Sequence, residues 1–388
     1  MTPDRRQFRD TSHYLAAVAS EVAYPLLRAS GRVYARRPAS PARTWRRGVI
    51  LGSGHIGDVL YRTCSLDHLA RELPECRWSY VTTPEGAEIL RGNPAVDEVL
   101  PLIRETATDF ASPSAVEQLR DRDFDVALCT DNIEHHRTLW LATRLGVPNR
   151  VAFVRKGFSG LATIPVGTPR ASWPAQIRSM VNVVTGVVDS SPLRPRIHLT
   201  GPDVAAARRE WQSLALPAAS LTIAVSLTSR QQLGVFPVSL FAGILRHTLA
   251  LQPDARIVLC GSAADSAQLH AMADTVGPRA EVRAGTVGLR VFAAFLSLCD
   301  AFLGADSGPR HLANAAGIPV FFVRNLAVPE IEAGAYCETE IDLAPAGQYM
   351  SDAAAIRLLE SVDEQSAARA LVTAATLTRS RKRESPGL

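Results

Sequence analysis

The most informative stretch of this sequence is Gly48-Val-Ile-Leu-Gly-Ser-Gly-His-Ile-Gly-Asp-Val-Leu60. The apolar run 49–51 predicts a short buried strand, after which come a glycine-rich loop and an amphipathic helix. Asp58 stands where the loop becomes the helix. A loop built only to hold phosphate would avoid a carboxylate there, because a helix N-terminus attracts anions. The carboxylate therefore either caps the helix or takes part in chemistry.

The chain beyond that stretch alternates predicted strands and helices, which indicates parallel βαβ units. Its 388 residues exceed one ordinary core and predict two domains. We expect an α/β protein with two Rossmann-like, doubly wound parallel sheets that face a cleft. The Pro-rich stretch from Ser190 to Pro195 is the best linker candidate, and no clear strand is expected between Pro165 and Pro174. The predicted strands are 49–51, 78–82, 99–102, 126–129 and 151–153, then 221–227, 256–260, 280–283, 301–303 and 320–323.

Composition limits the partners of the protein. The net charge of +4 gives only a mild preference for anions, so nucleic acid is not an expected partner. The six cysteines form no CxxC pair, which predicts buried free thiols in a reducing cytoplasm. We expect neither a secretory signal nor a membrane span. Residues 1–46 read as a helical extension with basic residues that packs on the body or touches an anionic membrane surface, and the basic tail 379–383 is expected to be disordered.

The second informative stretch is Phe302-Leu-Gly-Ala-Asp-Ser-Gly-Pro-Arg-His-Leu-Ala-Asn-Ala-Ala-Gly-Ile-Pro-Val320. A strand ends here, and Pro309 suits the first turn of the helix that follows. Asp306 or Ser307 can cap that helix, and amides near Gly308 can hold a diphosphate, with Arg310 or His311 adding charge. The alternative is a well-capped structural helix without a ligand.

Ser226-Leu-Thr-Ser-Arg230 places hydroxyls and a guanidinium directly after a strand. Thr228 and Ser229 can donate to phosphate oxygens, and Arg230 can bind them as a fork. Similar loops are common without any ligand.

Other motifs in the sequence are excluded or weak. Residues 52–57 match GxGxxG, but no acidic residue ends the next strand, so NAD binding is a minor alternative. His135 and His136 follow a strand and are expected to be solvated. Neither an HExxH motif nor a His–Cys cluster is present, so no metal is predicted. There is also no GxSxG nucleophile motif.

Taken together, these residues resemble glycosyltransferase family 9, the ADP-heptose:lipopolysaccharide heptosyltransferases and their relatives. The resemblance covers roughly residues 47–330. It rests on Gly54-His-Ile-Gly-Asp58, Asn93-Pro-Ala-Val-Asp-Glu-Val99, Phe124-Asp-Val-Ala127, and Asp306-Ser-Gly-Pro-Arg-His311 with Gly317-Ile-Pro-Val320.

The resemblance implies a GT-B fold with an N-terminal helical extension. It implies an inverting, metal-independent enzyme that moves a heptose or related sugar from a nucleotide diphosphate, ADP, to a hydroxyl of the lipopolysaccharide core. No cofactor is implied beyond the nucleotide-sugar donor, and the expected place is the cytoplasm, with peripheral contact at the inner membrane face left open. The implied parts are the extension 1–46, an acceptor domain 47–190, a donor domain 191–350, and a C-terminal helix and basic tail 351–388.

The resemblance also implies roles for single residues. Asp58 is similar to the general base that takes a proton from the acceptor hydroxyl, and Gly54, His55 and Gly57 are similar to the acceptor-side loop. On the donor side, Asp306, Ser307 and Gly308 would meet the sugar and diphosphate, with His311 supporting the helix start. Thr228 and Ser229 match a Thr-Thr pair that contacts phosphate, with Arg230 beside them, and Asp265 matches an acidic residue that binds ribose hydroxyls.

Two features depart from the family pattern. No Lys follows in the segment 230–237, and Arg324-Asn-Leu-Ala327 stands where a Gly-Pro-Thr turn is usual. One alternative is therefore the same chemistry on a small-molecule acceptor, such as an aminocyclitol or a nucleoside. Another is a GT-B sugar-nucleotide binder or epimerase. Asp58 argues against a pure binder, and the lack of a His/Glu-rich signature argues against an epimerase.

Overall fold

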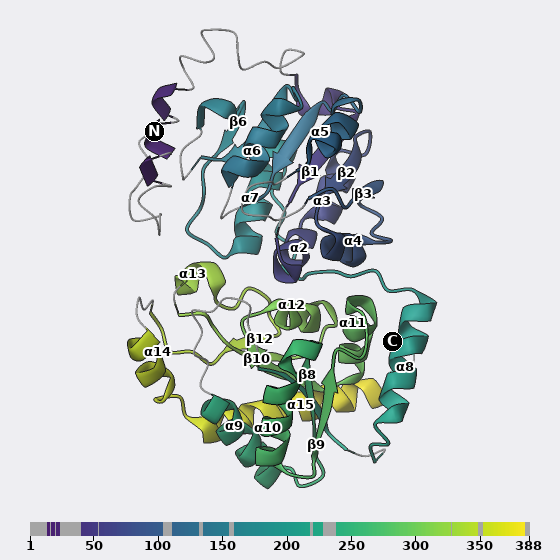
Figure 1. The fold of residues 1–388 in the computed structure, drawn as a ribbon, viewed down its shortest axis with the longest axis vertical. Helices are drawn as coiled ribbons and strands as arrows, with labels where there is room; N and C mark the ends of the chain where they lie inside the picture. Colours follow the sequence, from purple (N-terminus) through teal and green to yellow (C-terminus); the bar gives the residue numbers. More distant parts are fainter. Residues whose placement is uncertain are drawn as a thin grey trace. The chain divides into compact units, whose positions relative to one another are not determined.

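The computed structural model describes residues 14–15, 17–19, 21–23, 40–52, 54–103, 111–131, 135–154, 159–217, 220–227, 238–326, 328–347 and 352–384. The chain divides into two compact units, residues 1–191 and 192–388 (Figure 1). The boundary falls inside the Pro-rich stretch 190–195. Within the extension 1–46, the described residues 14–15, 17–19 and 21–23 are helical.

The first unit is built on a parallel sheet with strand order β3-β2-β1-β4-β5-β6 in its described residues. This is the Rossmann order, in which the chain reverses direction across the sheet between β1 and β4. The strands are β1 Arg47–Leu51, β2 Arg77–Val81, β3 Glu98–Leu100, β4 Val126–Cys129, β5 Asn149–Phe153 and β6 Ile164–Val166. The helices are α2 Ile56–Thr63, α3 Leu66–Glu72, α4 Pro84–Leu90, α5 Pro113–Arg120, α6 His135–Arg144 and α7 Trp173–Thr185.

The second unit repeats the same architecture. Its sheet order is β12-β11-β10-β7-β8-β9, so β7 and β10 lie where β1 and β4 lie in the first sheet. Its strands are β7 Thr222–Ser226, β8 Arg256–Gly261, β9 Ala280–Ala284, β10 Ala301–Ala305, β11 Val320–Val323 and β12 Glu340–Asp342. Its helices are α8 Gly201–Ser213, α9 Val238–Leu251, α10 Ser266–Val276, α11 Leu289–Leu298, α12 Gly308–Ala315, α13 Glu330–Ala333, α14 Asp352–Leu359 and α15 Glu364–Glu384.

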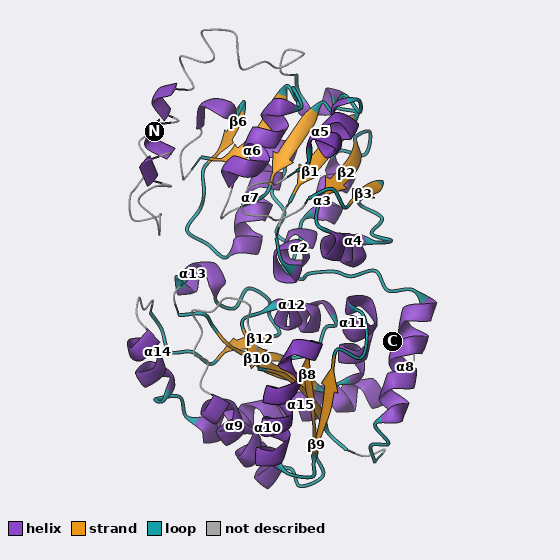
Figure 2. Ribbon diagram, in the orientation of Figure 1, coloured by secondary structure: helices purple, strands orange, loops and turns teal. Residues whose placement is uncertain are grey.

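The central strands are mostly apolar because helices surround the sheets and bury them (Figure 2). β1 pairs in parallel with both β2 and β4, and Leu51 at its end lies opposite Val81 and Cys129. In the second sheet, β10 lies between β7 and β11, with Gly304 opposite Ser226 and Ala305 opposite Val323. The expected pair of doubly wound parallel sheets is confirmed.

Two sequence expectations about the fold were wrong, and one helix was missed. The region 165–174 was expected to hold no strand, yet Pro165 lies in β6 and pairs with Ala152, because an edge strand tolerates a missing N–H. The tail was expected to be disordered, but it belongs to α15, where Arg379 and Lys382 bond to Asp300 and the Ser220 and Cys299 carbonyls. Helix α8 was not anticipated, although Thr200 and Asp203 form a capping box at its start.

The cysteines match expectation as free thiols, all buried except the half-buried Cys64. Over the part of the chain that the structure describes, helices fall short of the length and apolar character that crossing a bilayer requires.

Candidate active site

The candidate site of the first unit begins where β1 ends. The chain leaves the sheet after Leu51 and enters α2 at Ile56, at the point in the strand order where β1 and β4 diverge. Ligands of such sheets bind beyond the carboxyl ends of the strands at this switch point. Gly54 has φ +120°, and a Cβ there would stand 2.5 Å from Asp58 Oδ2. Both the backbone conformation and the space therefore require glycine.

Asp58 caps the helix. Its Oδ2 accepts the backbone N–H of His55 at 2.8 Å, while the His55 side chain accepts the backbone N–H of Asp58 in a reciprocal capping box. Gly57 is buried in the first turn, and Asp58 itself is half-buried. The cap uses one carboxylate oxygen, so capping and chemistry are compatible roles for this residue.

Burial and neighbouring charges set the proton affinity of Asp58. Burial, the largest influence, raises its pKa, and the carboxylate of Asp131 adds to the rise. Arg62 and the bond from His55 oppose it, but the net pKa lies above the ordinary aspartate value. A raised pKa brings a carboxylate closer to the range of an effective general base.

The buried side chains under Asp58 were not predicted from the sequence. Arg62 is 2% exposed, one turn after Asp58, and its Nε donates to the Thr130 carbonyl at 3.3 Å. Tyr61 hydrogen-bonds Asp58, and burial followed by the Asp58 charge raises the pKa of this phenol. Asp131 is buried just beyond β4. The i, i+4 spacing of Asp58 and Arg62, and an acid directly after a strand, were the available signals.

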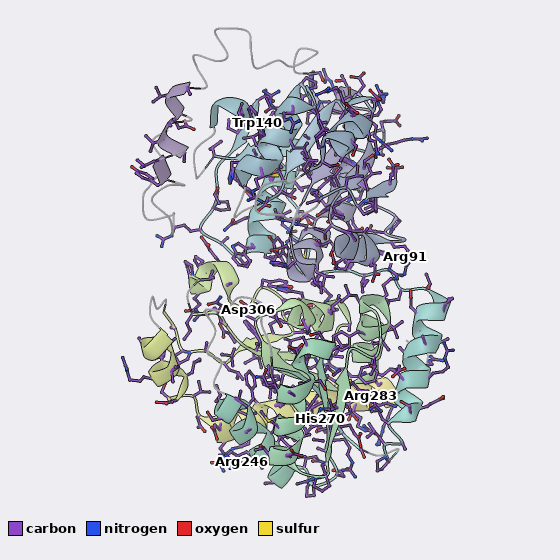
Figure 3. The ribbon with its side chains drawn as sticks, in the orientation of Figure 1. Arg91, Trp140, Arg246, His270, Arg283 and Asp306 are labelled. Carbon is purple, nitrogen blue, oxygen red and sulfur yellow. The ribbon has the colours of Figure 1, made fainter. Side chains whose placement is uncertain are left out.

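The candidate site of the second unit begins where β10 ends. Asp306 follows the strand, Ser307 is at the N-cap position, and α12 starts at Gly308 (Figure 3). The Ser307 hydroxyl donates to the Ala305 carbonyl at 3.3 Å and makes no cap bond to the helix. Pro309 occupies the first turn, as expected.

Arg310 and His311, the residues expected to add charge at this helix start, are both held by partners within the second unit. Arg310 is 1% exposed, and its guanidinium is held by Asp306 at 2.8 Å, by Glu340 at 2.6 Å and by two backbone carbonyls. Burial and the Arg310 charge lower the pKa of His311 to about 4. His311 is therefore neutral at pH 7, and its Nδ1 lies 2.7 Å from the Tyr336 hydroxyl.

The other predicted donor residues divide into two groups. Asp265 lies after β8, where its Oδ2 accepts the backbone N–H and the hydroxyl of Ser262 at 2.7 and 2.6 Å. Thr228, Ser229 and Arg230 lie outside the described residues.

The acidic residues of the described chain show no obvious metal centre. Among the residues with assigned positions, no three His, Cys, Asp or Glu side chains are grouped as metal ligands would be. The sequence does contain overlapping Asp-x-Asp triplets in 121–125. Asp123 pairs with Arg47 at 3.2 Å, and Asp125 accepts the backbone N–H groups of Arg46 and Arg47. These carboxylates fix the start of β1, at the opposite end of the strand from Asp58.

Comparison with known proteins agrees with this architecture. The solved glycosyltransferase family 9 protein from Veillonella parvula superposes with a TM-score of 0.67 at 18% identity, over 84% of this chain and 98% of that one. ADP-heptose lps heptosyltransferase II from E. coli gives 0.66 at 14% identity, over 86% and 99%. E. coli heptosyltransferase WaaC with ADP gives 0.58 at 17% identity, over 82% and 100%. No curated protein matches the sequence.

The fold is that of the GT-B glycosyltransferases. The sequence profile of "Glycosyltransferase family 9 (heptosyltransferase)" matches residues 114–322, more than half of the chain, and the chain belongs to that family. The protein is therefore a glycosyltransferase, and nucleotide-sugar transfer is its class of reaction.

Proposed function

We propose that this protein is an inverting transferase that moves a heptose or related sugar from an ADP-linked donor to a hydroxyl of the lipopolysaccharide core. Family membership supports the reaction class. Among the structural neighbours, E. coli WaaC was solved with ADP and with ADP-2-deoxy-2-fluoro heptose. The observation that carries the proposal for this chain is Asp58, a half-buried carboxylate with raised pKa at the switch point of the first sheet.

The proposed reaction is a single displacement. Asp58 removes the proton from the acceptor hydroxyl, whose oxygen attacks the anomeric carbon from the face opposite the diphosphate. The bond between that carbon and the diphosphate oxygen breaks, and the leaving nucleotide takes the electron pair. Because the raised pKa makes Asp58 a stronger base than an exposed aspartate, it retains the proton more readily as the new bond forms.

The second unit is proposed to bind the donor. The start of α12, with Asp306, Ser307 and Gly308, meets the sugar and diphosphate, because a helix N-terminus favours negative charge. Neutral His311 supports that turn through Tyr336. Thr228, Ser229 and Arg230 complete the phosphate contacts, and Asp265 meets the ribose. The scheme uses no metal and no cofactor besides the donor, and we place it in the cytoplasm with the basic extension 1–46 near the membrane.

A second candidate keeps this chemistry but uses a small acceptor, an aminocyclitol or a nucleoside. Its basis is a departure from the family pattern: Arg324, a fully buried residue, stands where family members carry a Gly-Pro-Thr turn. Its guanidinium binds Asp342 at 2.8 Å and the carbonyls of Pro345 and Gly347 at 2.9 and 3.0 Å. The end of β11 is therefore built differently in this chain.

The proposal is tested first by calorimetry with ADP, UDP, GDP and dTDP, and then by transfer from ADP-heptose to truncated lipopolysaccharide core. We expect ADP to bind most tightly and the core to accept the sugar. Transfer only to an aminocyclitol or nucleoside would establish the second candidate. Failure of all four nucleotides to bind would contradict both.

A further inference from the structure

A buried acid lies far along the chain from the α12 start and is nevertheless bonded to it. Glu340 begins β12, and its side chain is fully buried. Its Oε1 accepts Arg310 Nε and Asn314 Nδ2, both at 2.6 Å. Its Oε2 accepts the backbone N–H groups of Tyr336 at 2.8 Å and Cys337 at 3.2 Å. One carboxylate thus joins helix α12 to the loop before β12.

Arg310 connects that carboxylate to Asp306. Its Nη1 donates to Asp306 Oδ1 at 2.8 Å and to the Ala333 carbonyl at 2.9 Å, and its Nη2 donates to the Gly334 carbonyl at 2.8 Å. The guanidinium also lies over the Phe322 ring, 3.4 Å from its centroid. A planar, rigid fork held on so many sides defines the position of each carboxylate that it binds.

The energetics make this arrangement depend on Glu340. A buried guanidinium is costly unless carboxylates and carbonyls surround it. Burial raises the pKa of Glu340, but the charge and hydrogen bond of Arg310 outweigh it and the net pKa is lowered, so Glu340 is ionised at pH 7. If the charge of Glu340 is removed, the Arg310 guanidinium keeps only one carboxylate partner, Asp306, and interacts with it more strongly.

The same carboxylate fixes the neighbour of His311. Tyr336, whose backbone N–H binds Glu340, stacks on the His311 ring with centroids 5.6 Å apart and planes 20° apart. Its hydroxyl also bonds His311 and Asn314. Asp306 and His311, both assigned to the donor site, are therefore held by partners that share Glu340.

We propose that Glu340 is a positioning residue for nucleotide-sugar binding: through Arg310 it orients the Asp306 carboxylate, and through the 336–337 amides it holds Tyr336 against His311. This inference rests on the proposed donor role of the α12 start. It adds a residue that touches no substrate and that lies outside every motif of the family resemblance.

The test compares Glu340→Gln with Asp300→Asn, both measured at a temperature where each variant is folded. Asp300 is a matched control, because it is also a buried carboxylate that pairs with arginine (Arg379, 3.1 Å) and accepts a backbone N–H (Thr222, 2.9 Å). It precedes β10, about 20 Å along the chain from Asp306 at ~3.3 Å per residue. Calorimetry with ADP, UDP, GDP and dTDP reports affinity, and steady-state kinetics report KM and kcat.

Glu340→Gln is expected to raise the Kd of the nucleotide that the wild type binds by about tenfold, equivalent to ~1.4 kcal/mol. It should also raise the donor KM more than it lowers kcat, because Asp306 contacts the donor before and during reaction. Asp300→Asn should leave both values unchanged. Wild-type affinity in Glu340→Gln, or an equal loss in Asp300→Asn, would overturn the inference.

A double variant, Glu340→Gln with Arg310→Gln, separates positioning from stability. It leaves no unpaired buried guanidinium, so the melting temperature should recover relative to Glu340→Gln. Nucleotide affinity should remain low, because Asp306 has lost the group that orients it. Recovery of both together would show that Glu340 acts only on stability and would overturn the inference. If the wild type binds none of the four nucleotides, the proposed function fails first.

Discussion

Asp58→Asn removes the proposed base while keeping the shape of the helix start. The His55 N–H that Asp58 accepts at 2.8 Å can be accepted equally by the asparagine carbonyl, so the capping geometry is retained. The substitution also removes a desolvated charge. Because the folded pKa of Asp58 is raised above its ordinary value, the ionised form opposes folding at pH 7. We therefore expect the melting temperature to stay level or rise.

The rate should change in the opposite direction. General-base catalysis contributes about 10²–10⁴-fold, or ~3–5 kcal/mol of transition-state stabilisation. The amide of the substituted asparagine has no basic oxygen, so kcat should fall by that factor while the Kd of the nucleotide is unchanged. The assay is acceptor-dependent release of ADP from ADP-heptose, with nucleotide binding measured separately by calorimetry.

Asp203→Asn is the matched control. Asp203 also closes a capping box, accepting the Thr200 N–H at 2.8 Å, and it pairs with Arg290 at 2.8 Å. Its loss should lower stability by about 3 kcal/mol, as when a buried ion pair is broken, yet leave kcat unchanged below the melting temperature. Wild-type turnover in Asp58→Asn, or equal rate losses in both variants, would show that Asp58 is not the general base.

Three further predictions follow from the same contacts. Asp306→Ala should weaken nucleotide binding in calorimetry, and an unchanged Kd would remove Asp306 from the donor site. Arg62→Met should move the acidic limb of the kcat/KM profile to higher pH, because the Arg62 charge lowers the pKa of Asp58; a limb at the wild-type pH would contradict this. His311 has a folded pKa of about 4, below its ordinary 6.5, so the unfolded chain binds the extra proton and stability falls by about 3 kcal/mol as pH drops from 6.5 to 4. Melting curves of His311→Gln should lack that fall, and an identical pH dependence in the variant would contradict the assignment.

Much of the fold could be predicted because its signals are local. Apolar runs mark the central strands β1, β4, β7 and β10, and parallel sheets bury both faces of such strands. Edge strands carry weaker signals. β6 contains Pro165, and β12 contains two acidic residues, Glu340 and Asp342, which pair with the buried arginines Arg310 and Arg324. No local sequence pattern reveals that these acidic residues pair with arginines.

In the candidate site, too, the sequence indicated the main residues but not the partners that hold them. Asp58 and Asp306 stand out because each lies where a strand gives way to a helix, Asp58 in the first turn of α2 and Asp306 just before α12, a position that short motifs record. The groups that tune them are tertiary partners. Asp131 reaches Asp58 from a different strand, and Glu340 reaches Asp306 through Arg310 from 34 positions away in the numbering. The pairing of Arg310 with Glu340 could not be predicted for the same reason, since Glu340 lies in no motif.

The stereochemistry of transfer is the most direct test of whether Asp58 is the base of a one-step displacement. A single displacement assisted by Asp58 requires the new glycosidic bond to have the anomeric configuration opposite to that of the donor. Proton NMR of the product formed by the wild-type enzyme from ADP-heptose and its acceptor reads this configuration. We expect inversion of the anomeric configuration. A product that retains the donor configuration would contradict the assignment of Asp58 as the base of a one-step reaction.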